Sequence, residues 1–399
     1  MGNINVINLN VVHSMSDIQI DFNKLKRNLL KLGSIDQAVN IGAVIKANAY
    51  GHISAELIKV LKDQVDHYFV GTCDEAFNLA CDFSFEEINK HIMVMYTFTQ
   101  EDLELLDVFN NIVFNICDLD SLNLAVEYSK QINEKLRYII NKKKMKFNIQ
   151  NKKIKFNLNI DSGMHFLGIK PEELGEVINI LRTNKDYISI FAVNTHFATA
   201  DELETSLYYH DQVEVFKRAL NDLVDNNIDF EAISYHNTAS LIRNQYSFEE
   251  FKKQNIARIG IGMYGYYPSK EIENKYSSIK LEPVLTWSSK IISTKLLEKG
   301  DKIGYGNDYT CKGKTKIGII PIGYFEGYSR INSNKGTVAI NKKLYPVVGR
   351  IRMNMMAIDI TDSDVKTGDK VIIMNSIRTA DDIAKDTNTI NYEVLTNIK

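Results

Sequence analysis

Short apolar runs separated by amphipathic segments constrain the fold of the first two thirds of this 399-residue chain. Eight such runs follow one another: GAVIK from residue 42, HYFVGT from 67, HIMVMY from 91, NIVFNI from 111, KFNLNI from 155, ISIFAVNTHF from 188, FEAISYHN from 230 and IARIGIGMYG from 256. Most intervening segments, such as residues 201–227, repeat apolar residues every three or four positions, as helices do. Eight strands alternating with helices predict an α/β fold, a parallel (β/α)8 TIM-like barrel.

The sequence changes character after Tyr266. Four of the five prolines lie beyond it, and the apolar runs become rich in β-branched residues and glycine turns, as in KIGIIPIGYFEGY from residue 316. These features predict a separate, mostly antiparallel β domain. We therefore expect a barrel over residues 12–265 and a β domain over 266–399, with residues 1–11 packed against the second domain.

A near-duplication interrupts the alternating pattern before the fifth strand. KKKMKFNIQ from residue 142 is followed directly by NKKIKFNLN from residue 151. Lysines alternating with apolar residues predict two strands, which would form an added hairpin ahead of the fifth barrel strand. We expect the lysines to form a solvated strand face and assign them no chemistry.

Charge and cysteine usage narrow the class of partner. Lys and Arg number 48 against 50 Asp and Glu, a net charge of -2, so the chain lacks the basic surface that nucleic acid or an anionic membrane would require. The first ten residues do not resemble a signal peptide, and no apolar stretch reaches the ~20 residues of a membrane span. The four cysteines are scattered, which favours reduced thiols over disulfides or a metal site. We expect a cytoplasmic protein with a small-molecule partner.

Lys46 is the first candidate for chemistry. It ends the apolar run in VIKANAYGH, and the carboxyl ends of barrel strands face the active site. A lysine that is desolvated there, near other cations, has a lowered pKa and can form a Schiff base. The ordinary alternative is a solvated lysine at a strand end, so the flanking residues must decide between the two readings.

The segment KANAYGH closely resembles the one around the cofactor lysine of the pyridoxal-phosphate-dependent alanine racemases, fold-type III amino-acid racemases. Further segments resemble motifs of that family in the same order: THFATADE (195–202), ARIGIGMYG (257–265), GYGNDYT (304–310), IPIGYFEGY (320–328), VVGRIRMN (347–354) and TINYEV (389–394). The resemblance covers nearly the whole chain. It implies pyridoxal 5'-phosphate as cofactor and Lys46 as the lysine that bears it.

Racemisation requires a base on each face of the planar carbanion, and Lys46 would serve one face. No histidine follows His236, so a second base from the C-terminal domain must be Tyr, Lys, Cys or a carboxylate. The resemblance implies Tyr305 of the partner subunit, supported by a hydrogen bond from His196. It also implies that Arg258 contacts the pyridine nitrogen. Because arginine keeps its proton, that nitrogen would stay unprotonated, which limits side reactions such as transamination.

GIGMYG also spells GxGxxG, with Gly260, Gly262 and Gly265, which alone could indicate a dinucleotide fold. Pro268 opposes the long helix that such a fold requires. Phosphate binding after the late barrel strands is the better interpretation, with the N–H groups of Gly260 and Ile261 facing the phosphate. The resemblance adds three residues to this cofactor site: Tyr50, Asn237 and Thr238.

The resemblance also implies substrate-binding residues and a homodimer. It places four residues where substrate enters, namely Tyr324, Arg330, Arg350 and Asp201, and it assigns the backbone N–H of Met353 to the substrate carboxylate. In the family, the equivalents of Tyr305 and Tyr324 reach the cofactor of the partner subunit. A homodimer with shared active sites follows from this resemblance.

The pattern of the family breaks at four positions. Phe166 stands where the family has an arginine that contacts the cofactor's phenolic oxygen and the substrate carboxylate, and a phenyl ring cannot make that charge-assisted bond. Asn159 stands where many members have a modified lysine that orients this arginine. Arg352 replaces a small residue and Asn354 an aspartate. We hypothesise that Arg352 supplies the missing cation to the carboxylate.

The chain ends at Lys399, soon after TINYEV, whereas the resemblance implies a further segment with an active-site tyrosine that contacts the phosphate. We therefore expect that tyrosine to be missing. The leading interpretation is a racemase that interconverts L- and D-alanine for peptidoglycan precursors. One alternative is a racemase of serine or a larger amino acid, for which Asn354 offers a donor. Another is a degenerate homologue that binds cofactor or amino acid without turnover.

Overall fold

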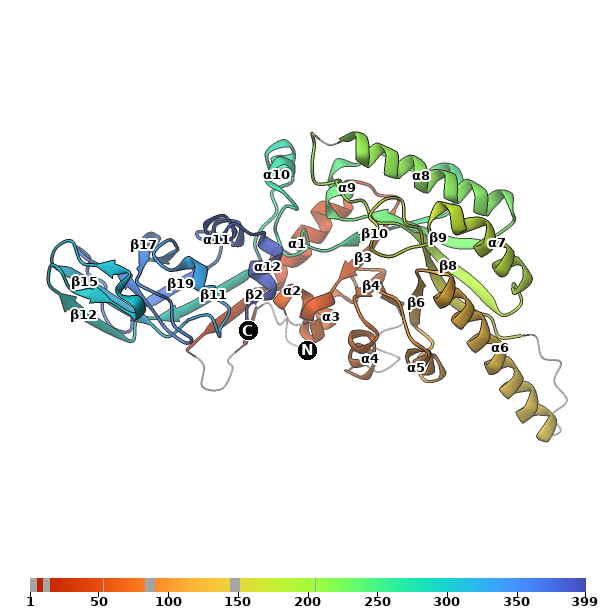
Figure 1. Cartoon of the computed structure of the whole chain (residues 1–399), viewed down its shortest axis with the longest axis horizontal. Helices are drawn as coiled ribbons and strands as arrows, with labels where there is room; N and C mark the ends of the chain where they lie inside the picture. The colour runs from red at the N-terminus through yellow and green to blue at the C-terminus, as the bar shows by residue number, and fades with distance from the viewer. Residues whose placement is uncertain (1–5, 10–14, 53, 83–89, 144–150, 205) are drawn as a thin grey trace.

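The computed structural model describes residues 6–9, 15–52, 54–82, 90–143, 151–204 and 206–399. The molecule is elongated, with a barrel at one end and a β domain at the other (Figure 1). Among these described residues, no helix combines the length and the apolar character that a membrane crossing demands.

Eight parallel strands form a closed barrel in the order β10-β3-β4-β5-β6-β7-β8-β9. Their bounds are β3 (Val39–Val44), β4 (His67–Val70), β5 (Ile92–Val94), β6 (Ile112–Ile116), β7 (Ile154–Asn159), β8 (Ile188–Asn194), β9 (Phe230–His236) and β10 (Gln254–Ile259). Each of the eight apolar runs overlaps one of these strands, so the predicted barrel is confirmed. Pairing of β10 with β3 closes the barrel and sets Arg258 opposite Gly42.

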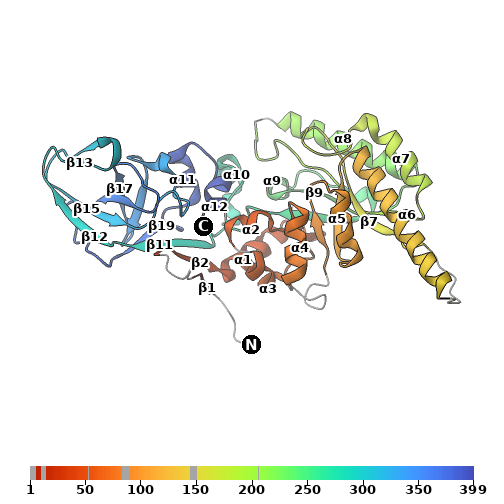
Figure 2. The same cartoon turned by 60° about the horizontal axis from the view of Figure 1, so that its bottom comes forward.

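Helices cover the outside of the barrel (Figures 1 and 2). They are α1 (Phe22–Gly33), α3 (Ser54–Leu61), α4 (Cys73–Asp82), α5 (Gln100–Leu103), α6 (Leu119–Lys142), α7 (Leu174–Thr183), α8 (Ser206–Asp225) and α9 (Thr238–Arg243). Because side chains fill the inside and helices cover the outside, the strands are apolar on both faces. Every residue of β4, β5 and β6 is accordingly buried.

The segment with the near-duplication is only partly described. Lys142 ends helix α6, so it does not begin a strand. Residues 144–150, on which most of the first predicted strand falls, lie outside the described residues. The second predicted strand is β7 itself, the fifth strand of the barrel in chain order.

The second sheet has nine strands in the order β1-β2-β11-β19-β16-β17-β18-β15-β12, and its pairs are antiparallel. The bounds are β1 (Val6–Leu9), β2 (Asp17–Asp21), β11 (Leu285–Lys290), β12 (Ser293–Leu297), β15 (Thr315–Ile320), β16 (Thr337–Ile340), β17 (Lys343–Val348), β18 (Met356–Asp359) and β19 (Lys370–Met374). A further pair joins β13 (Lys302–Ile303) to β14 (Tyr309–Thr310). The mostly antiparallel β domain is therefore confirmed.

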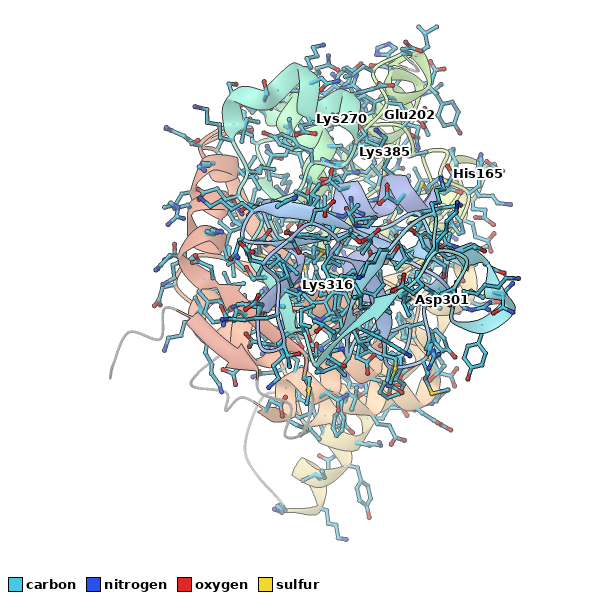
Figure 3. All side chains as sticks on the ribbon, turned by 90° about the vertical axis from the view of Figure 1, so that its left-hand side faces the viewer. His165, Glu202, Lys270, Asp301, Lys316 and Lys385 are labelled. Atoms are coloured by element: carbon cyan, nitrogen blue, oxygen red, sulfur yellow. The ribbon has the colours of Figure 1, made fainter. Side chains whose placement is uncertain are left out.

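Both ends of the chain build this sheet. Strand β2 precedes the first barrel strand in sequence but pairs with β11 in the second sheet, and β1 pairs with β2. The division at residue 265 stays a prediction. Figure 3 looks onto the β domain from its free end, with Lys316 of β15 and Asp301 before β13 labelled.

The last helices carry the chain back to the barrel. After α10 (Lys270–Tyr276) and the sheet come α11 (Ala380–Thr387) and α12 (Asn391–Thr396), and α12 lies against α2 (Lys46–Gly51), as Figure 1 shows. A Cβ atom at Gly51 would lie 2.5 Å from the Leu395 carbonyl oxygen, so glycine is what allows this approach. Helix α12 thus reaches the carboxyl edge of the barrel.

Candidate active site

Lys46 lies at the carboxyl end of β3, where it begins α2. The preceding residue, Ile45, is buried, and its N–H donates to the Phe69 carbonyl of β4 at 2.8 Å. The hydrogen bonds between β3 and β4 therefore fix the position of the backbone up to the residue before Lys46. The Lys46 side chain then lines a cavity at the edge where (β/α)8 barrels place their active sites.

The four residues after Lys46 form a left-handed turn. Residues 47–50 have φ angles between 51° and 56°, although none is glycine. This conformation costs about 1–2 kcal/mol for each residue that carries a Cβ atom. Burial of Ala49 and Tyr50 offsets part of that cost, and the Tyr50 ring lies 4.9 Å from the Tyr264 ring, centroid to centroid. The turn carries Tyr50 to the cavity wall.

Arg258 is buried at the end of β10 and is held by the barrel wall. One terminal nitrogen donates to the Ser234 carbonyl and hydroxyl, and the other to the Thr195 carbonyl, all at 2.6 Å. Burial lowers the pKa of Arg258 to about 10, so it keeps its proton near neutrality. The second terminal nitrogen also lies 3.4 Å from Nδ1 of His196.

His196 and Lys46 both lose protons more readily than usual. Burial among protein atoms, followed by the charges of Arg258 and Lys46, lowers the pKa of His196 to about 3, although the ring borders the open cavity. Burial also lowers the pKa of Lys46, with Arg258 acting in the same direction and Glu75 opposing it. The imidazole is therefore neutral near pH 7, and the Lys46 amine gives up its proton more readily than a solvated lysine does.

The loop after β10 forms a small cradle. The N–H groups of Gly260 and Gly262 donate to the Thr238 hydroxyl at 3.3 and 3.4 Å. A Cβ atom at Gly260 would lie 2.6 Å from the Tyr50 hydroxyl, so glycine keeps this space open. Asn237 caps α9 by accepting from the Ser240 N–H at 2.9 Å. The Thr238 hydroxyl accepts both of these bonds and keeps its own proton to donate, and the Tyr50 hydroxyl lies beside Gly260, so two hydroxyl groups are available to an anionic group.

One cavity of about 540 Å³ brings the predicted cofactor residues together. Its lining includes all seven of them: Lys46, Tyr50, Asn237, Thr238, Arg258, Gly260 and Ile261. His196 and Asp201 also line it. A second compartment of about 560 Å³ shares Lys46, His196 and Arg258 with the first.

The second compartment contains the two positions where the family pattern breaks inside the barrel. Phe166 lies on its wall with 84% of its side chain exposed. Asn159 donates to the Leu167 carbonyl at 2.8 Å and accepts from Asn194 at 2.6 Å. Its amide therefore links the end of β7 to the end of β8 and to the loop that contains Leu167. The space beside Phe166 therefore remains open rather than filled by a charged side chain.

The residues predicted to bind substrate or to act as the second base lie together in the β domain, apart from the Lys46 cavity. The guanidinium carbon of Arg352 lies 5.1 Å from the Tyr305 ring centroid. The Tyr324 N–H donates to the Arg352 carbonyl at 3.2 Å, and the neighbouring Met353 is 55% exposed. Among the described residues that line the Lys46 cavity, none comes from this cluster. Within one chain, the proposed second base and Lys46 are therefore not brought together.

The charged residues around this cluster have partners of their own. Arg350 forms an ion pair with Asp308, whose second oxygen accepts from the guanidinium at 3.0 Å. Asn354 donates to Glu326 at 2.7 Å, which engages one of the two N–H groups of the amide proposed as a donor to a serine hydroxyl. Arg330 opens a short 3-10 helix before β16 and does not line the Lys46 cavity within the described ranges.

The sequence interpretation missed three residues of the site. Tyr392, inside the motif TINYEV, lines the cavity with its ring centroid 6.0 Å from that of Tyr50. This end of the chain therefore brings a tyrosine to the cavity, whereas we expected the family's active-site tyrosine to be missing. Packing of α12 on α2 brings Tyr392 there. Tyr96 places its ring 5.8 Å from the Lys46 amine, and Glu75 contacts the left-handed turn. No motif pointed to these two.

Fold and site together define the class: a two-domain barrel protein with a lysine-centred cavity at the carboxyl ends of its strands. Comparison with known proteins names the family. Residues 20–268 match the family described as alanine racemase, N-terminal domain, and residues 284–399 match alanine racemase, C-terminal domain. The chain belongs to the alanine racemase family, which confirms the resemblance seen in the sequence and the prediction that it is an enzyme of this kind.

Individual relatives agree over nearly the whole chain. An alanine racemase of Clostridium kluyveri is 32% identical over 385 residues, which covers 94% of this chain and 90% of the relative. The structure of an alanine racemase of Clostridium difficile 630 has a TM-score of 0.80 at 31% identity, covering 97% and 94%. A Bacillus anthracis alanine racemase with bound L-Ala-P has a TM-score of 0.81 at 27% identity, covering 97% and 93%.

Proposed function

We propose that the protein interconverts L- and D-alanine, with pyridoxal 5'-phosphate bound at Lys46 and with active sites shared between two subunits of a homodimer. Its membership of the alanine racemase family supports the reaction. The observation that carries the proposal is the convergence of Lys46, Arg258 and His196 on one cavity at the carboxyl edge of the barrel. The reaction would supply D-alanine for peptidoglycan precursors in the cytoplasm.

The residues present fit pyridoxal phosphate. The amine of Lys46 has a lowered pKa, as imine formation with an aldehyde requires. The Thr238 hydroxyl accepts from the Gly260 N–H and can donate its own proton to a phosphate, and Tyr50 and Tyr392 line the same cavity. Arg258 lies in the wall, where it would face the ring nitrogen. The cofactor, when bound, supplies an electron sink that acidifies the α-proton of an amino acid.

Proton transfer is then divided between two side chains. Lys46 takes or returns the α-proton on one face, and Tyr305 from the second subunit does so on the other. His196 is neutral near pH 7, and because Arg258 can only donate to its Nδ1, the imidazole proton lies on Nε2, from which it can be donated to the tyrosine oxygen to orient it. Arg258 keeps its own proton and offers a donor, so the ring nitrogen that it faces stays unprotonated.

Arg352 is the residue that we propose for the substrate carboxylate. Among the described residues that line the two compartments, the basic side chains are Lys46 and Arg258, apart from the neutral His196. Arg258 is engaged with the barrel wall, and Lys46 is needed for proton transfer. Because the Arg352 guanidinium stacks against the ring of Tyr305, it would enter the cavity of the second subunit together with the proposed base.

Replacing Arg352 with alanine is expected to raise the KM for alanine by about 10- to 100-fold while kcat changes less, because a charge-assisted hydrogen bond to the substrate is lost. Inhibition by acetate, which carries a carboxylate and no amine, should weaken by a similar factor. Lys295→Ala is the matched control, because Lys295 and Arg352 both line a hollow of about 330 Å³ in the β domain, whose described lining does not include Tyr305. Phe166→Arg in the Arg352→Ala background should restore part of the affinity. An unchanged KM for Arg352→Ala would remove the assignment.

The reaction itself is tested by measuring D-amino-acid production from a panel of L-amino acids by the cofactor-loaded protein. We expect alanine to be the best substrate by kcat/KM. A preference for serine or a larger amino acid would replace the substrate assignment. Absorbance of a lysine-bound cofactor with no turnover on any substrate would show a binding protein without racemase activity.

A further inference from the structure

Glu75 connects the left-handed turn after Lys46 to the neighbouring strand. Its side chain comes from the first turn of α4 and is half-buried. One carboxylate oxygen accepts from the Ala47 N–H at 2.6 Å, and the other accepts from the Gly71 N–H at 2.7 Å, at the end of β4. The Thr72 N–H also points to that second oxygen, at 3.4 Å. A single carboxylate therefore ties the residue after Lys46 to the adjacent β4–α4 loop.

The turn needs such a tie. Four consecutive residues with Cβ atoms lie in the left-handed region, and each adds local strain. The backbone of the turn is also held by bonds within it, from the Ala49 N–H to the Ile45 carbonyl and from the His52 N–H to the Ala49 carbonyl. Glu75 differs from these because it joins the turn to another part of the barrel, and it does so directly beside Lys46.

Charge distinguishes Glu75 from an ordinary loop contact. The charged and titratable groups that face the Lys46 amine are Glu75 from α4, Arg258 from β10 and His196 after β8, with the Tyr96 ring after β5. Arg258 is positive and His196 neutral, so Glu75 is the anion of this set. Removing its charge while keeping its shape would leave Lys46 beside a cation without compensation.

We propose that Glu75 is a positioning residue: its carboxylate pins the strained turn that places Lys46 and Tyr50, and it balances the positive charge at the lysine that bears the cofactor. The inference rests on the proposed function only in taking Lys46 as the cofactor lysine. Glu75 does not touch the reacting atoms. Its effect reaches the reaction through the position and the proton affinity of Lys46.

Glu75→Gln tests both parts of this role. The amide keeps the shape but loses the charge, and it can accept from one of the two backbone N–H groups while presenting its own donor to the other. We expect the pH midpoint of the absorbance of the lysine-bound cofactor to move to lower pH, because a neighbouring anion stabilises the protonated nitrogen. Cofactor affinity should fall about tenfold. The cofactor-free protein should unfold at a lower temperature.

Asp74→Asn is the matched control, because Asp74 is the adjacent carboxylate on α4 and is exposed. It should leave the pH midpoint, the affinity and the unfolding temperature unchanged. Glu75→Asp retains the charge, so it should keep the pH midpoint near that of the wild type even if the shorter side chain lowers stability. The proposal is overturned if Glu75→Gln keeps the wild-type midpoint, or if Asp74→Asn shifts it equally. These readouts need no turnover, so absence of racemase activity would count against the proposed function alone.

Discussion

Replacing Lys46 with alanine is expected to abolish the absorbance of the lysine-bound cofactor and to lower racemisation of alanine by more than about a thousandfold. Two roles are lost at once, the amine that holds the cofactor covalently and the base on one face of the substrate, and a positioned base alone contributes about 10²–10⁴. The measurements are the visible absorbance spectrum after cofactor loading and the rate of D-alanine formation from L-alanine.

The control for this prediction is Lys59→Ala on the neighbouring helix α3, where the lysine is exposed and pairs with Glu56. That variant should bind cofactor and racemise alanine as the wild type does. Added methylamine should restore part of the Lys46→Ala activity if the variant is folded, because a free amine can enter the space of the missing side chain. Near-normal turnover by Lys46→Ala would show that the chemistry lies elsewhere.

Much of the barrel was predictable because its strands are buried on both faces. Most then appear in the sequence as short, largely apolar runs, and the run that contains β5, Ile92–Val94, is a clear example. The β domain was predictable from turn chemistry. Between β16 and β17, Asn341 and Lys342 adopt φ angles of 49° and 67°, which the tight two-residue hairpin turn requires and which asparagine tolerates well. Local rules were sufficient in both cases.

The site depended on contacts that no local rule describes. Nothing in the sequence Ala-Asn-Ala-Tyr predicts four left-handed residues. The turn is held by packing against Tyr264 and by a hydrogen bond to Glu75, and both residues are distant from the turn in sequence. Tyr392 was overlooked because its position depends on α12 returning to α2. The near-duplicated segment misled for a different reason, because a lysine-rich stretch suits the end of a helix as well as a strand, and α6 continues to Lys142.

Tyr305→Phe is expected to lower racemisation by about 10²–10⁴ while cofactor binding is retained. The phenyl ring keeps the stacking surface for Arg352 but removes the hydroxyl that would carry the proton. Exchange of the α-hydrogen with deuterated water should survive for one enantiomer of alanine, because Lys46 still serves its own face. Equal loss of exchange for both enantiomers would contradict a division of labour between two bases.

The same variant tests whether the site is shared. In one chain, Tyr305 is 66% exposed on the β domain, outside the described lining of the Lys46 cavity, so the two proposed bases would have to meet across a subunit interface. Mixing Lys46→Ala and Tyr305→Phe proteins under subunit exchange should therefore recover about a quarter of wild-type activity, since half of the dimers are hybrids and each hybrid has one intact site. Mixing Lys46→Ala with the Lys46→Ala/Tyr305→Phe double variant should recover none, because no pairing restores the lysine. If the first mixture also stays inactive although hybrids form, Tyr305 does not act across the interface, and the shared site is wrong.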